Sequence, residues 1–466
     1  MKNRRKLQRV VSSVLMAVMA VSFTGCNMNT AKKDSNENVK ITIGGWPVPE
    51  SQPEKNQLYK KSLEEYNSLY PNVEVSTVEY SYSLEQFMSR YVSGQQPDVY
   101  YAPFTEPKRL ADTGYIRDVT DEMKSRGFDK AIDPQILEVV TRDGKYYGLP
   151  TDAYMMGLLC NVELFEKAGL VDKNGVPIYP KTYKELAETA KIIKQKTGVS
   201  GFDIPTTGTE GGWMLMNIAW SNGVKFLEET EDGKYKPAFE TQEMYDTLQY
   251  IKDLKWKYNV FPDTVLNGTA GVQKLFGIKQ TAMIITSDVN INDIVTKYKF
   301  NKDKLSFTNL PAGSKERCAL IGGGCQLMGA NLSDAQVKAC FDWLALLGNT
   351  STYSQDDLDK IEKDLKAQQA DGKVITRPVL SIWTNKERTN AINKVYDKYI
   401  NVDEKLWSVN QNDVVLRTEE PVAAQQLYSV LSNAMQEVIL DENSDIKAVV
   451  ANAAATLQKD YLDNME

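Results

Sequence analysis

An alternation of short strands and amphipathic helices begins at residue 39 and sets the strongest limit on the fold. Val39–Ile43 alternates apolar and polar side chains, as a half-buried strand does, and 44–47 (GGWP) then predicts a loop. The same reasoning predicts, in turn, a helix at 57–70, a strand at 73–78, a helix at 83–92 and a strand at 97–101. This order predicts an α/β protein with a parallel, doubly wound sheet.

Further elements follow the same logic along the chain. A capping box at Thr182 and Glu185 predicts a helix start, and 282–286 is typical of a buried strand. Helices are also predicted at 161–168, at 241–258 and in the tail, where Ile446, Val450, Ala453 and Leu457 form one apolar stripe.

Length and charge limit the classes of protein. A chain of 466 residues, 42% hydrophobic and 25% charged, suits two globular domains. The net charge is −7 and no long basic run follows the first residues, so we expect no nucleic-acid partner. The chain has no histidine, which excludes Ser-His-Asp and Cys-His nucleophile systems and His-liganded zinc.

The first residues are typical of a targeting segment. Basic residues precede an apolar run at 10–22, which is too short to span a membrane. The sequence 23–26 (FTGC) closely resembles a lipobox, which implies a lipid on Cys26; the alternative is a plain secretory signal with a chance cysteine. We expect a signal peptide at 1–25 and a flexible tether at 26–38.

Four other cysteines stand at 160, 318, 325 and 340, in no metal-binding or redox spacing. Cys318 and Cys325 could pair across a hairpin, although free buried thiols are the simpler expectation. We expect no metal and no cofactor.

Several segments in a fixed order resemble extracellular solute-binding proteins of the maltose-binding type, which serve ABC importers. They are 66–75 (YNSLYPNVEV), 94–100 (GQQPDVY), 143–152 (DGKYYGLPTD) with 160–165 (CNVELF), the helix around 183–186, and the stretch from 310–313 (LPAG) to 322–324 (GGG).

The resemblance implies a two-lobe fold of the periplasmic-binding-protein type (type II). Each lobe would have a mostly parallel sheet flanked by helices, the ligand would bind in the cleft between the lobes, and a hinge would close around it. The crossovers would lie near 150–154 and 310–313. The lobes would comprise 39–152 with 312–390, and 153–311 with 391–466. The protein would be a monomer, lipid-anchored on the extracellular face of a cell membrane, and would deliver a carbohydrate to permease subunits.

Sugar rings offer apolar faces and a belt of hydroxyls, so a sugar site needs aromatic rings beside hydrogen-bonding side chains. Trp46 follows the first strand in a glycine loop, where it is a ligand candidate or a packing residue. Tyr100 and Tyr101 end a strand, so one should face the cleft and the other the core. Adjacent tyrosines also occur in iron-binding relatives, an interpretation that the sequence favours less.

The resemblance places Asp152 and Tyr154 at the first crossover, facing the cleft or forming a hinge turn. Trp213 and Trp220 are seven residues apart and could share a helix face as a core stripe; Trp213, after two glycines, is the better ligand candidate.

Asp288 stands where many relatives carry Gly-Pro-Trp, and could replace stacking by a hydrogen bond. Gly323 and Gly324 would let the backbone approach a ligand or would form a tight turn. Trp383 and Arg417 are further candidates, and Arg417 could equally be exposed or in a salt bridge.

These observations predict a binding protein for a carbohydrate, in particular an oligosaccharide, rather than an enzyme. The alternatives are a receptor for a non-sugar solute such as a peptide, a surface adhesin, and a glycoside hydrolase that uses two carboxylates. No nucleophile elbow, P-loop or metal motif supports an enzyme.

Overall fold

A computed structural model describes residues 38–50 and 52–465. The predicted signal peptide, the lipidation site Cys26 and all but the last residue of the tether lie outside these described residues. Within them, no helix is both long enough and apolar enough to cross a membrane.

One mixed sheet organises the described residues, with the path β12-β10-β6-β11-β3-β1-β2; β13 pairs with β11 and β9 with β6. Its strands are β1 (Val39–Ile43), β2 (Val73–Thr77), β3 (Val99–Pro103), β6 (Leu149–Asn161), β9 (Met283–Ser287), β10 (Leu305–Thr308), β11 (Cys318–Met328), β12 (Trp407–Ser408) and β13 (Val415–Arg417). Two small hairpins pair β4 (Thr141–Arg142) with β5 (Lys145–Tyr146) and β7 (Leu227–Glu229) with β8 (Tyr235–Pro237).

The predicted parallel sheet at the start of the chain is confirmed. β1 pairs in parallel with β2 and with β3. The connecting helices are α1 (Pro53–Leu69) and α2 (Leu84–Val92). The Ser83 hydroxyl caps α2 by accepting a hydrogen bond from the Gln86 N–H.

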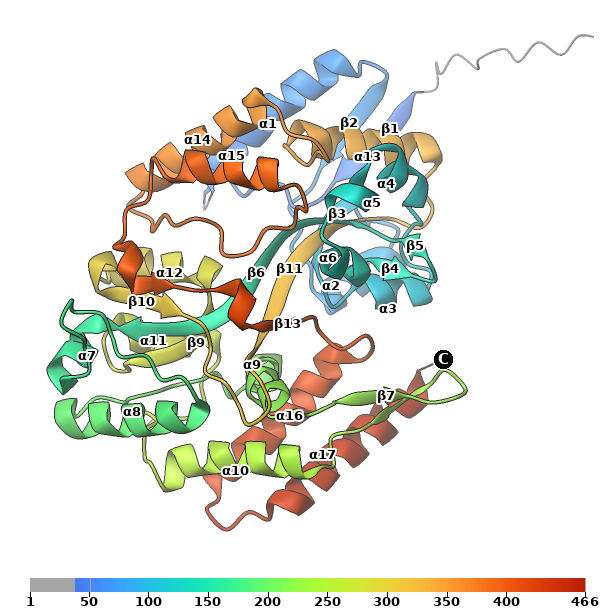
Figure 1. Cartoon of the computed structure of the whole chain (residues 1–466). Helices are drawn as coiled ribbons and strands as arrows, with labels where there is room; N and C mark the ends of the chain where they lie inside the picture. Colours follow the sequence, from blue (N-terminus) through green and yellow to red (C-terminus); the bar gives the residue numbers. More distant parts are fainter. Residues whose placement is uncertain (1–37, 51, 466) are drawn as a thin grey trace, which may run out of the picture. The chain divides into compact units, whose positions relative to one another are not determined.

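Two long strands join this half of the sheet to the other half, and they run side by side through the middle of Figure 1. The first part of β6 pairs antiparallel with β11, from Leu149 to Met155, and its second part pairs with β9 and β10. We call β6 and β11 the crossover strands. β6 spans the predicted first crossover, and β11 begins at Cys318, after the predicted second one; the lobe boundaries remain predictions.

The capping box at α8 (Tyr183–Thr197) differs from the prediction in one bond. The Thr182 hydroxyl accepts from the Glu185 N–H, but the Glu185 carboxylate accepts from the N–H of Lys181, one residue before the cap.

α9 (Gly208–Ser221) lies against α16 (Ala424–Leu440), because Gly212 has no side chain where the Tyr428 backbone passes.

The other helices complete the layers around the sheet. They are α3 (Pro107–Asp112), α4 (Thr120–Ser125), α5 (Phe128–Ala131), α6 (Pro134–Val139), α7 (Val162–Ala168), α10 (Gln242–Trp256), α11 (Thr269–Gly277), α12 (Ile291–Tyr298), α13 (Asp334–Leu346), α14 (Gln355–Ala370), α15 (Lys386–Tyr396) and α17 (Ile446–Asp460).

The four described cysteines are free and buried. Cys318 and Cys325 are the first and eighth residues of the same strand, β11. Seven residues of strand span about 23 Å, so the hairpin pairing considered for them does not occur.

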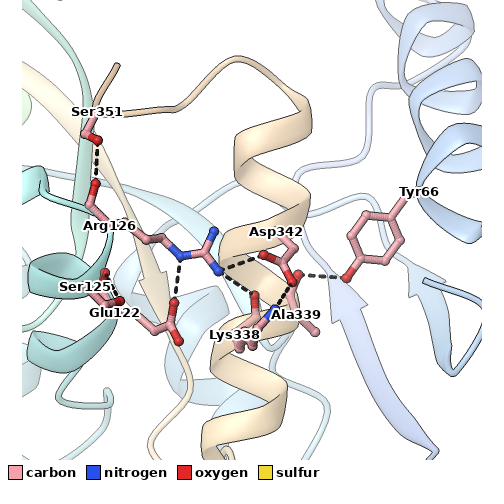
Figure 2. Close-up of polar contacts among 8 residues, drawn as sticks. All are labelled: Tyr66, Glu122, Ser125, Arg126, Lys338, Ala339, Asp342 and Ser351. Atoms are coloured by element: carbon pink, nitrogen blue, oxygen red, sulfur yellow. Dashed lines mark hydrogen bonds and ion pairs between the residues drawn. The ribbon is translucent and has the colours of Figure 1, made fainter. Parts of the chain in front are cut away.

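An arginine network fastens α4 to α13 (Figure 2). The Arg126 guanidinium donates to Glu122 Oε2 at 2.6 Å and to Asp342 Oδ1 at 2.7 Å, and lies 5.3 Å from the centre of the Phe341 ring. Asp342 is only 10% exposed, so its charge depends on Arg126 and Lys338 for compensation. The Arg126 carbonyl also accepts a hydrogen bond from Ser351, in the loop after α13.

We expect Arg126→Ala to lower the free energy of unfolding by about 2–4 kcal/mol, because Asp342 keeps a buried charge with one partner fewer. Urea unfolding measures the change. Arg377→Ala is the matched control: Arg377 is 49% exposed beside Asp397, so its loss should cost about 0–1 kcal/mol. Equal effects of the two substitutions would contradict the role of the Arg126 network.

Candidate functional site

Strands β3, β6 and β11 bring together several of the predicted site residues. Asp152 of β6 pairs with Gly324 of β11, and β3 lies on the other side of β11. The Tyr101 hydroxyl reaches across β11 and donates to Asp152 Oδ1 at 3.2 Å. Asp152 also accepts from the neighbouring Thr151 hydroxyl at 3.2 Å.

Gly322, Gly323 and Gly324 lie within β11, so the tight turn considered as an alternative for Gly323 and Gly324 does not occur. A Cβ on Gly322 would stand 2.5 Å from the Tyr154 ring, and one on Gly324 would stand 1.9 Å from the Tyr101 ring. These two positions share one face of the strand, so Tyr101 and Tyr154 lie on the same face. On the other face, the Phe104 ring occupies the space beside Gly323.

A third aromatic ring comes from α9. Trp213 meets Tyr154 edge-to-face, with ring centres 6.5 Å apart and an interplanar angle of 79°. The Trp213 indole N–H donates to Glu419 Oε1 at 2.9 Å. Glu419 follows β13, which pairs with β11. The same sheet therefore positions Tyr154 and Glu419, the two side chains that contact Trp213.

Asp288 lies beside β6 at the end of β9, where Ser287 pairs with Met156. Its Oδ1 atom is buried and has no hydrogen-bond partner among the described residues, and the same holds for the Ser287 hydroxyl. Burial raises the pKa of Asp288 to about 6.

We call Tyr101, Asp152, Tyr154, Trp213, Asp288 and Glu419 the crossover cluster. Burial raises the pKa of Glu419 to about 7, and the hydrogen bond from the Trp213 indole opposes that rise. None of the three carboxylates forms an ion pair within the described part of the chain. The cluster therefore offers hydrogen-bond acceptors beside aromatic rings, with little positive charge.

Tyr100 and Tyr101 face opposite sides, as strand alternation predicts: Tyr100 is fully buried and Tyr101 is 42% exposed. The two hydroxyls cannot ligate one iron ion. Trp46 is half-buried in a packed aromatic group, stacked at 6.2 Å on Trp343 and edge-to-face at 5.5 Å with Tyr59. Its surroundings are those of the packing alternative.

Two further candidates lie in other contacts. The Arg388 guanidinium covers one face of Trp383, 3.6 Å from the ring centre. Arg417 pairs with Glu316 at 2.8 Å, which is the salt bridge considered for it from the sequence. Trp220 is 3% exposed and belongs to the core.

A cavity of about 370 Å³ lies apart from this cluster. It is lined by Trp407, Arg377, Val379, Ile400 and Asn410, among others, and by no residue of the crossover cluster.

Sequence reasoning missed Glu419 and the buried Glu106. Glu106 binds Arg109 and accepts from the Tyr82 hydroxyl, and its charge adds to the rise in the pKa of Glu419. The signal in the sequence is weak, because Glu419 follows a strand of only three residues in a tail that the sequence predicts to be helical.

The family model for bacterial extracellular solute-binding proteins matches residues 61–361. The chain belongs to this family. Its members are solute-binding proteins and not enzymes. The family resemblance inferred from the sequence is therefore confirmed.

Relatives of this solute-binding protein are similar over part of their length. The arabinooligosaccharide-binding protein of Bacillus subtilis is 23% identical over 257 residues, 53% of this chain and 54% of the relative. A Brucella abortus protein described only as a candidate binding protein is 30% identical over 203 residues, 43% of this chain and 44% of the relative. The matches thus span about half the length of these curated relatives.

Solved structures confirm the predicted fold class for this solute-binding protein. A solute-binding protein of Thermotoga lettingae, solved with α-D-tagatose, has a TM-score of 0.65 at 20% identity, with 91% of this chain and 99% of that chain covered. The GacH receptor of Streptomyces glaucescens, solved with and without acarbose, has a TM-score of 0.65 at 17% identity, with 92% and 100% covered.

We expect Gly324→Ala to displace the Tyr101 ring and to lower the free energy of unfolding by about 1–3 kcal/mol, because the new Cβ would overlap that ring. Chemical denaturation measures it. Gly329→Ala, just after the same strand, is the control, since its Cβ would meet nothing nearer than 4.0 Å. A Gly324→Ala protein as stable as the control would refute the packing described for Tyr101.

Proposed function

We propose that this solute-binding protein captures a carbohydrate, in particular an oligosaccharide, at the crossover cluster and delivers it to an ABC importer. The halves of the sheet joined by the crossover strands act as lobes that close around the ligand by a hinge motion. The protein would then release its ligand, chemically unchanged, to the permease subunits of the importer.

One observation carries the proposal: carboxylates and aromatic rings converge on the crossover strands. The Tyr154 and Trp213 rings meet edge-to-face, and Glu419 holds the indole N–H. A pyranose presents C–H faces that pack on such rings and hydroxyls that donate to carboxylates. The Asp288 Oδ1 atom, which has no hydrogen-bond partner in the described part of the chain, is an acceptor of this kind.

Charge further favours a neutral ligand. Asp152 and Asp288 would repel the carboxylate of a uronic acid or the phosphate of a sugar phosphate. Neutral hydroxyl groups pay no such cost, so we propose a neutral sugar.

The comparisons support the ligand class. Relatives in Bacillus subtilis and Rhizobium radiobacter are an arabinooligosaccharide-binding and a lactose-binding protein. The Thermotoga and Streptomyces structures hold tagatose and acarbose. We favour the crossover cluster over the cavity at Trp407, because that cavity lies at the β12 edge of the sheet and not on the crossover strands.

We also propose that the protein is a monomer without enzymatic activity, held by a lipid on Cys26 at the extracellular face of the cell membrane. The lipobox-like sequence at 23–26 supports the anchor. A receptor for import needs only to bind and release its solute, and the family to which the chain belongs consists of solute-binding proteins.

Isothermal titration against a panel of mono- and oligosaccharides, peptides and metal ions tests the ligand class. We expect a neutral sugar to bind and to be recovered chemically intact. A peptide as the only ligand would overturn the carbohydrate assignment, and a cleaved glycan would indicate a glycoside hydrolase.

Once the sugar is identified, we expect Trp213→Ala to weaken its binding free energy by about 1–3 kcal/mol, because a stacking surface is lost. Trp256→Ala is the matched control, because Trp256 is 39% exposed on α10 and donates its indole N–H to the Val438 carbonyl, away from the cluster. Unchanged affinity in Trp213→Ala would remove Trp213 from the binding site.

We expect Cys26→Ser to release the protein into the medium, because the hydroxyl of serine cannot form the thioether to the lipid. Fractionation of cells and medium, followed by immunoblotting, measures the release. Retention of the variant with the membrane would contradict the lipid anchor.

A further inference from the structure

A buried arginine lies on α15, far along the chain from the crossover strands. Arg388 is 5% exposed. Its Nη1 donates to the Thr350 carbonyl at 2.7 Å, and its guanidinium stacks on Trp383. No carboxylate pairs with it among the described residues, and its Nε has no hydrogen-bond partner there.

This environment compensates the charge only in part. Taking a cation out of water is costly unless an anion and hydrogen bonds replace the lost hydration. The Thr350 carbonyl and the face of the Trp383 ring replace only part of the hydration that the guanidinium has lost. Consistent with this, burial lowers the pKa of Arg388 to about 10.

A cavity of about 130 Å³ adjoins Arg388, between α14, α15 and the loop before α14. Lys360, Tyr353 and Gly348 also line it, with apolar walls from Leu358 and Ile392. Its volume is roughly four times the ~30 Å³ share of one water molecule, enough for a compact ion.

One carboxylate, Asp357, also lines the cavity. Its Oδ2 atom already accepts from the N–H and the hydroxyl of Ser354, in the capping box that starts α14. Asp357 is therefore engaged at the helix start and forms no ion pair with Arg388 among the described residues, although its charge opposes the lowering of the Arg388 pKa by burial. Arg388 and Lys360 both line the cavity, against this one carboxylate, and the Lys360 Nζ atom also donates to the Leu346 carbonyl at 3.4 Å.

We propose that this cavity is a binding site for a compact oxyanion, held by Arg388 and Lys360. Phosphate, sulfate and a small carboxylate share the required chemistry: oxygen acceptors that a guanidinium binds by charge-assisted hydrogen bonds. This site is separate from the crossover cluster and does not rest on the proposed function.

Occupation of the site would brace the loop between α13 and α14. That loop is fastened on one side by Ser351, which donates to the Arg126 carbonyl (Figure 2), and on the other by the Thr350 carbonyl, which accepts from Arg388. An anion on Arg388 would fix the side chain that holds Thr350. Binding would therefore stabilise the protein against unfolding.

Equilibrium dialysis of labelled inorganic phosphate, sulfate and acetate, each in turn against the full-chain protein, tests the proposal, at constant ionic strength set with chloride. We expect saturable binding, competed by sulfate or acetate according to which oxyanion the cavity prefers. Arg388→Gln should weaken binding about tenfold or more, since it removes charge-assisted hydrogen bonds. Lys360→Gln should weaken it several-fold by loss of one facing charge.

Lys363→Gln is the matched control, because Lys363 is exposed on the same helix and does not line the cavity; its binding should be unchanged. Should Arg388→Gln fail to fold by circular dichroism, Lys360→Gln decides. Absence of saturable binding of any of the three oxyanions, or equal binding by Lys360→Gln and Lys363→Gln, would overturn the proposal.

Discussion

The antiparallel pairing of β6 with β11 is the constraint on which the rest of the structure depends. These strands belong to both halves of the sheet, so their register fixes which residues of one half meet those of the other. Asp152 stands opposite Gly324 because of that register, and Tyr154 stands opposite Gly322. A slip of one residue would turn every one of these side chains to the other face.

Glycine makes this arrangement possible. The rings of Tyr101 and Tyr154 lie where side chains at 324 and 322 would otherwise be. The site is thus built by leaving space in one strand and filling it with rings from its neighbours. Glu419 then fixes Trp213 against Tyr154, which makes it a positioning residue as well as an acceptor.

The sequence predicts well the features that depend on local periodicity. The parallel strands at the start of the chain, the helix predicted at 83–92 and the opposite faces of Tyr100 and Tyr101 all follow from side-chain spacing. Spacing cannot predict which side chain from a distant segment arrives next to a ring. Trp343, 297 positions after Trp46, stacks on it, and Arg388 covers Trp383; both contacts depend on tertiary packing. Glu419 was missed for the same reason.

The crystal structure of the protein with its bound sugar is the most direct test of the central claim, that the ligand binds on the crossover strands. The account predicts sugar density in contact with Tyr154 and Trp213, with hydroxyls hydrogen-bonded to the carboxylates of the crossover cluster. Sugar density in the cavity at Trp407, with the crossover cluster empty, would contradict it.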